Sequence, residues 1–205
     1  MKAFNQIHTR ISIIFLFFAF IVSCASIPEL KVHYQLPPRA DVLKGKRVFL
    51  TLKDDRSTRD IIGPGAKKDF VNFPGNITFS FAAYNEPGFK LGPYTPVAMT
   101  KEAFKKRLEN LGLEVLSQPS PGDPELSIVL ERFLLDLKGY DWVAEISYRG
   151  SLMKGGKVLS EQSVSGQGER LKVVGHSQAN TVLSGIFTDL VNRLDVVSLF
   201  RQAGL

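Results

Sequence analysis

The sequence predicts an α+β domain in two layers, with a largely antiparallel sheet of about four to five strands and two amphipathic helices packed on one face. Three observations support this fold class. Apolar residues alternate along much of residues 126–170, as in the strands of an antiparallel sheet. Two segments, 100–111 and 177–200, repeat apolar residues at helical spacing. The composition, 44% hydrophobic and 22% charged, is that of a folded protein.

The first half of the domain contains separate strand and helix signals. A strand is expected at residues 46–53, where β-forming residues dominate. Residues 61–96 are rich in glycine and proline around one further strand at 76–83, so this segment is either a functional loop or a hairpin region. A helix follows, capped by Thr100 and ended by Gly112, before a short strand at 113–116.

The second half predicts a meander of antiparallel strands and a final helix. The alternation changes phase near Glu131-Arg132, which indicates a β-bulge. Gly155-Gly156 predicts a tight hairpin turn, because both glycines accept positive φ. The last helix is expected over about 177–200, with Ser177 as its N-cap. Polar residues on the second face of the meander strands indicate that this face is exposed to water.

The first 23 residues have the pattern of an export signal. Lys2 and Arg10 precede an apolar run over residues 11–22, which as a helix reaches about 18 Å and cannot cross a hydrocarbon core of ~30 Å. The run ends in Ile21-Val22-Ser23-Cys24, which resembles the lipobox of bacterial lipoproteins. Cys24 is the only cysteine, so an internal disulfide or a cysteine-rich metal site is excluded.

The lipobox resemblance implies cleavage before Cys24 and covalent N-acyl and S-diacylglycerol lipid on that residue, which anchors the chain stably. Residue 25 is Ala rather than the Asp that resembles an inner-membrane retention signal in enteric bacteria. We therefore expect the inner leaflet of the outer membrane. Residues 24–45, with three prolines, are expected to be the lipidated N-terminus and an extended tether, and residues 46–205 a single periplasmic domain.

The chain resembles the YajG-type family of uncharacterised bacterial lipoproteins. The resemblance rests on the lipobox, the Gly-Gly hairpin before a terminal helix, and three short motifs: Tyr34-Gln35-Leu36-Pro37, Leu52-Lys53-Asp54-Asp55-Arg56 before Ile62-Gly63, and Leu111-Gly112-Leu113-Glu114-Val115. It covers most of residues 32–200. The layout is also similar to auxiliary lipoproteins of ABC-type lipid transport systems and, more distantly, to LptE-like lipoproteins. This resemblance implies an outer-membrane lipoprotein without an established enzymatic activity.

Candidate catalytic and metal sites are weak. Ser177 follows His176 at the start of a helix, as in a hydrolase nucleophile elbow, but no histidine follows Ser177 in the chain to act as its base. No histidines and carboxylates repeat at metal-ligand spacing, so neither metal nor cofactor is expected beyond the lipid on Cys24. Modest positive charge is ordinary for a soluble domain, and nothing requires nucleic acid.

Two groups of residues are candidates for ligand or partner contact. Asp54, Asp55 and Arg56 form either a polar site at a strand end or a solvated turn. The irregular segment concentrates phenylalanines, which either pack a core of their own or present an apolar contact surface; we favour packing. These are Phe70, Phe73, Phe79 and Phe81.

The sequence thus favours a non-enzymatic module that binds an unidentified envelope protein while Cys24 holds it to membrane lipid. The alternative is an accessory lipoprotein of a lipid or lipopolysaccharide transport system that binds acyl chains or anionic lipid. In the lipid-transport alternative, Lys67-Lys68 and the basic residues of 101–107 could contact lipid phosphate. The default interpretation of these residues is a solvated helix or loop face.

Overall fold

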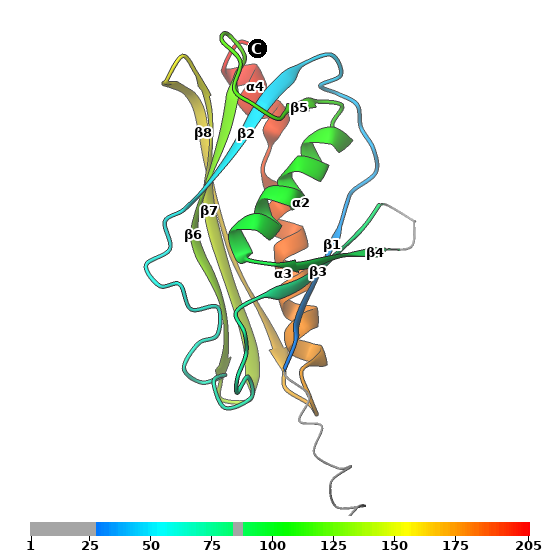
Figure 1. Cartoon of the computed structure of the whole chain (residues 1–205), viewed down its shortest axis with the longest axis vertical. Helices are drawn as coiled ribbons and strands as arrows, with labels where there is room; N and C mark the ends of the chain where they lie inside the picture. The colour runs from blue at the N-terminus through cyan, green and yellow to red at the C-terminus, as the bar shows by residue number, and fades with distance from the viewer. Residues whose placement is uncertain (1–27, 84–87) are drawn as a thin grey trace, which may run out of the picture.

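The computed structural model describes residues 28–83 and 88–205, and its larger sheet has five strands in the order β5-β2-β6-β7-β8 (Figure 1). The long antiparallel meander is formed by β6 (Glu125–Lys138), β7 (Asp141–Lys154) and β8 (Lys157–Leu171). β2 (Arg47–Asp54) runs parallel to β6 on one side and to β5 (Glu114–Leu116) on the other. The predicted α+β class and the meander are confirmed.

A smaller, three-stranded sheet in the order β1-β3-β4 was not expected. β1 (Leu30–Gln35) pairs in parallel with β3 (Ile77–Ala82), which forms a hairpin with β4 (Phe89–Tyr94). The interpretation of 25–45 as an extended tether is therefore wrong for residues 30–35, because the side chains of Leu30, Val32 and Tyr34 are fully buried. The irregular segment packs a hairpin, one of its two expected forms.

Three helices cover one face of the large sheet (Figure 1). They are α2 (Pro96–Asn110), α3 (Ser177–Arg193) and α4 (Val196–Gln202). The two predicted amphipathic helices and their common face are confirmed.

The ends of these helices differ from the predicted ones. Thr95, not Thr100, caps α2, because its side chain accepts from the backbone N–H of Ala98 and proline fills the first helical position. Thr100 lies inside the helix and donates to the carbonyl of Pro96. Ser177 is the first residue of α3 and does not cap it. The predicted terminal helix breaks at Leu194, and Asp195 caps α4.

The edge of β6 changes partner at the predicted bulge. β2 pairs with β6 as far as Asp54 opposite Leu130, and the register of β6 against β7 shifts between Leu130 and Arg132. Beyond the shift, residues 61–63 pair with the same edge, since Ile62 lies opposite Leu135 in a parallel bridge. The bulge therefore marks the point where one neighbour of β6 ends and another begins. The Gly155-Gly156 turn has the predicted positive φ values of 57° and 78°.

The core between the two sheets centres on Phe187 of α3, whose side chain is buried. Its ring meets Tyr34 and Phe79 of the small sheet at centroid distances of 6.0 and 6.2 Å, and Phe133 of the large sheet at 6.4 Å. All three contacts are edge-to-face, the geometry that aromatic quadrupoles favour. Phe187 thus joins the sheets through the helix between them.

A row of polar side chains on α3 occupies the free edge of β1. The backbone N–H groups of Lys31, His33 and Gln35 donate to side-chain oxygens of α3 at 2.9, 3.0 and 3.2 Å. The partners on the helix are spaced four residues apart, and we call them the α3 ladder: Asn180, Ser184, Thr188 and Asn192. The last member donates its amide to the carbonyl of Gln35 and accepts from the Tyr34 hydroxyl. The edge strand is therefore hydrogen-bonded on both sides.

Replacing Ser184 by Ala removes the acceptor of the His33 N–H, and we expect a loss of about 1 kcal/mol in the free energy of unfolding because this edge is partly exposed to water. Urea unfolding measures the loss, and amide hydrogen exchange at His33 should become faster. Ser177→Ala on the same helix is the matched control, because Ser177 does not cap α3. Equal stabilities of the two variants would contradict the ladder.

Candidate functional site

The residues of the predicted lipidation site, Ile21, Val22, Ser23 and Cys24, lie outside the described part of the chain. Leu30 is fully buried and follows Cys24 by six residues, so covalent geometry limits the distance between the two Cα atoms to about 20 Å. An anchor at Cys24 would hold the domain itself close to a bilayer.

A cavity of about 500 Å³ lies between the end of β2 and the start of α2. It brings together four of the predicted contact residues, Asp54, Arg56, Phe70 and Phe73. We call it the β2–α2 pocket, and its other lining residues are Arg59, Asp60, Ile61, Ile62, Lys67, Gly75, Thr95, Pro96 and Val97. The pocket is thus charged on one side and apolar on the other.

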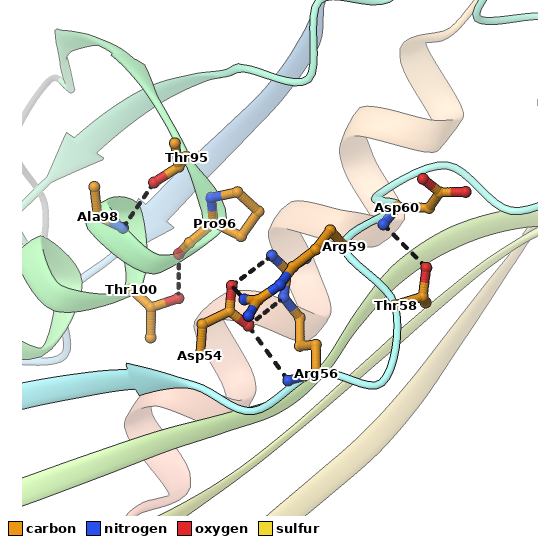
Figure 2. Close-up of polar contacts among 9 residues, drawn as sticks. All are labelled: Asp54, Arg56, Thr58, Arg59, Asp60, Thr95, Pro96, Ala98 and Thr100. Atoms are coloured by element: carbon orange, nitrogen blue, oxygen red, sulfur yellow. Dashed lines mark hydrogen bonds and ion pairs between the residues drawn. The ribbon is translucent and has the colours of Figure 1, made fainter.

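The charged side is organised by Asp54, the last residue of β2 (Figure 2). Its carboxylate accepts two hydrogen bonds from the guanidinium of Arg56, at 2.8 and 2.9 Å, and one from the Arg56 backbone N–H. Arg59 adds a further ion pair. Hydrogen bonding to Arg56 lowers the pKa of Asp54 from 3.8 to about 2, so this carboxylate is ionised and is a poor proton acceptor.

The two arginines play different parts in the pocket. The Arg56 side chain is only 6% exposed, so its charge is committed to Asp54 and to the fold of the turn. The side chains of Arg59 and Lys67 are 67% and 63% exposed and remain accessible to an incoming group. The exposed rim thus carries Arg59, Lys67 and the equally exposed Asp60, which pairs with Lys67, so its net charge is positive by one. The apolar part of the lining is formed by Ile61, Ile62, Phe73, Pro96 and Val97.

The phenylalanines behave mainly as packing residues, as we favoured. Phe70, Phe79 and Phe81 are buried in the core, and Phe73 is half-buried against it. Phe70 also contacts Trp142 of β7 edge-to-face, at a centroid distance of 5.9 Å, and forms one wall of the β2–α2 pocket. Asp55 is exposed and does not line this pocket.

Ser177 and His176 do not form a nucleophile and base in this geometry. The His176 ring packs on Phe70 at 4.6 Å between centroids, and its Nε2 is hydrogen-bonded to the carbonyl of Asp69 at 2.7 Å. The Ser177 hydroxyl is exposed and donates to the side chain of Gln178. Over residues 28–83 and 88–205, no three histidine, cysteine or acidic side chains gather closely enough to hold a metal ion.

The sequence analysis did not identify one residue of the pocket or the ladder that holds β1. Arg59 was not singled out, although it follows the flagged Asp54-Asp55-Arg56 run by three residues. The α3 ladder was also missed, although its four-residue spacing opposite the apolar stripe was readable. In both cases the sequence contained a usable pattern: Arg59 lies three residues after Arg56, and the ladder residues repeat every four positions along the predicted helix.

Asp54→Asn should lower the free energy of unfolding by about 2 kcal/mol at pH 7, because a carboxylate with a depressed pKa stabilises the fold above its unfolded pKa. This contribution is complete above about pH 4 and is lost as the pH falls through about 2. Denaturant unfolding at a series of pH values should therefore show the difference between wild type and variant shrinking with acid. Asp60→Asn, in an exposed pair, is the control; an equal effect there would refute the assignment.

Comparison with known proteins shows the fold and no family. No protein-family profile matches the chain, and no curated protein matches it in sequence. Protein XCC0632 from Xanthomonas campestris, a DUF330 protein, is similar in structure with a TM-score of 0.52 and 15% identity, over 86% of this chain and 94% of that one. At this level of identity the likeness is one of fold.

Solved structures with weaker likeness include bacterial lipoproteins. A minor lipoprotein from Acinetobacter baumannii has a TM-score of 0.40 and 12% identity, over 78% of this chain and 94% of its own. The rare lipoprotein B from Shewanella oneidensis has a TM-score of 0.39 and 10% identity, over 76% and 97%. In the described ranges of this chain, no helix combines the length and hydropathy needed to span a membrane.

Proposed function

We propose that this chain is a bacterial lipoprotein, anchored by N-acyl and S-diacylglycerol lipid on Cys24, whose domain faces the periplasm from the inner leaflet of the outer membrane. The proposal is supported by the order of three features at the N-terminus: basic residues, a short apolar run, and Ile21-Val22-Ser23 directly before the only cysteine. Membership of the YajG-type family is part of this proposal.

The observation that carries the proposal is the position of the lone Cys24, directly after Ile21-Val22-Ser23 and six residues before Leu30. Among the described residues Leu30 is the first that is fully buried, and hydrogen bonds on both edges hold its strand. An ordinary secretory signal needs no cysteine at the position where cleavage is expected. A thioether-linked lipid at this point would hold a folded module directly at the membrane surface.

The domain acts in this proposal as a non-enzymatic module that binds an envelope protein. The candidate acid–base side chains already have partners within the domain. The Asp54 carboxylate is bound by two arginines, and the His176 ring is hydrogen-bonded to the carbonyl of Asp69. Such groups are poorly suited to move protons or attack a substrate. The β2–α2 pocket, with its apolar wall and basic rim, is the surface that we assign to the partner.

In cells fed an alkyne-tagged fatty acid, the wild-type chain should take up the tag and fractionate with the outer membrane, whereas Cys24→Ala should do neither, because it lacks the thiol that forms the thioether. Gel fluorescence of the fractionated envelope measures both. Ser23→Ala, which keeps a small residue before the cysteine, is the control and should remain labelled. An unlabelled wild-type protein would refute the proposal.

A second candidate function is that of an accessory lipoprotein in lipid or lipopolysaccharide transport. The observation that favours it is the arrangement of the β2–α2 pocket, where exposed Arg59 and Lys67 stand beside apolar side chains in a cavity of about 500 Å³. A phosphate next to an acyl chain matches that pattern of charge and apolar surface.

Native mass spectrometry of the lipoprotein purified from membranes separates the two functions. In the second, wild type should retain an anionic phospholipid beyond its covalent lipid, and the double variant Arg59→Glu/Lys67→Glu should lose it through charge repulsion. Lys154→Glu/Lys157→Glu makes the same charge change at the exposed β7–β8 turn and should retain it. If the wild-type protein carries no phospholipid besides its covalent lipid, the result contradicts the lipid-transport function and favours the protein-binding one.

A further inference from the structure

Exposed apolar side chains are concentrated at one end of the molecule. Among the described residues, large apolar side chains are strongly exposed at seven positions, and Val42 and Val158 lie apart from the rest. The other five include the two most exposed, Val174 at 88% and Tyr140 at 83%. We call these five the basal patch: Val71, Tyr140, Leu171, Val173 and Val174.

Strand pairing, a backbone hydrogen bond and an ion pair bring the three segments of the basal patch together. Asp141, at the β6–β7 turn, is paired with Leu171 at the end of β8, and the backbone N–H of Lys172 donates to the carbonyl of Tyr140 at 2.8 Å. The Lys172 ammonium binds Asp69 at 2.5 Å, which fixes the segment carrying Val71 against the same end. The patch is therefore a continuous part of the surface built from loops and turns.

The basal patch lies at the end where the chain arrives from Cys24. The N–H of Lys31, at the start of β1, donates to Asn180 in the first turn of α3, and Val174 precedes that helix by three residues. Figure 1 shows the β6–β7 turn and the beginnings of β1 and α3 at the same, lower end of the molecule. The start of β1 and the basal patch thus share one end of the described domain.

We propose that the basal patch docks on the surface of the bilayer that holds the lipid of Cys24, an inference that rests on the lipidation proposed above. The anchor cannot lie more than about 20 Å from Leu30, so the lower end of the domain stays at the lipid headgroups. Valine and leucine side chains there enter the boundary between headgroups and acyl chains. A tyrosine ring is at its most favourable in this zone, with its apolar body in lipid and its hydroxyl in water.

Docking at this end fixes the direction of the domain. The β7–β8 turn and the C-terminus lie at the opposite, upper end in Figure 1, so they would point away from the membrane. A single lipid anchor without docking would leave these surfaces free to tumble.

The test uses the lipidated full-length protein in vesicles of phosphatidylethanolamine and phosphatidylglycerol. The Cys24 sulfur is blocked by its thioether, so Val174→Cys introduces a single reactive thiol for an environment-sensitive fluorophore. A nitroxide on the lipid headgroup should quench a label at residue 174 several times more strongly than one at residue 158. Val158→Cys is the matched control, because it is also an exposed valine and lies beside the Gly155-Gly156 turn.

A second variant tests the apolar contact itself. With the label moved to Tyr140→Cys, the additional change Val173→Asp/Val174→Asp should reduce quenching to the level of the residue 158 control, and unchanged circular dichroism would show that the fold is intact. Equal quenching at residues 174 and 158 would overturn docking.

Intact mass separates failure of docking from failure of the proposed function. A protein with lipid on Cys24 and unequal quenching supports both. A lipidated protein with equal quenching keeps the lipoprotein role and removes the docked orientation. A chain recovered with an unmodified Cys24 refutes the lipoprotein role, and with it the basis for docking.

Discussion

The α3 ladder is the interaction on which the rest of this fold depends. A strand edge leaves every second backbone amide without a partner, and edges left open in this way pair readily with other chains. In this protein the free edge of β1 is taken by side chains of a helix instead of another strand. The geometry permits it because four residues of helix advance about 6.0 Å and two residues of strand about 6.6 Å. Three successive rungs stay in register before the mismatch becomes large.

Because the ladder holds β1, residues 30–35 become part of the core. Leu30, Val32 and Tyr34 fill space beside Phe187, and that ring in turn joins the small sheet to the large one. Burial also raises the pKa of the Tyr34 hydroxyl, which donates to Asn192 of the ladder. The same strand begins at the lower end of the domain (Figure 1), so the packing of the core fixes where the described chain starts.

Local patterns predicted most of the large sheet and the amphipathic helices. The alternation in β6 and β7, the phase change near Arg132 and the Gly155-Gly156 turn are properties of neighbouring residues. The small sheet was missed because its pairing joins residues 30–35 to 77–82, and the prolines that flank β1 suggested a tether. For the helix ends, Thr100 and Ser177 are good capping residue types, but Pro96 and Asp195 set the actual boundaries. The β2–α2 pocket contains predicted contact residues together with Arg59 and Pro96, and these come together only in the tertiary fold.

The exchange of partners along the edge of β6 has a consequence for how this protein can vary. From Asp54 to Ile62 the chain uses eight residues to run beside five of β6, from Leu130 to Leu135. The extra residues loop out of the sheet, and they carry the buried Arg56 into the lining of the β2–α2 pocket and the exposed Arg59 to its rim. Insertions or deletions in this excursion would widen or narrow the mouth while both pairings on either side of it persist. The size and lining of the pocket can therefore change by loop length alone, without altering the framework that supports it.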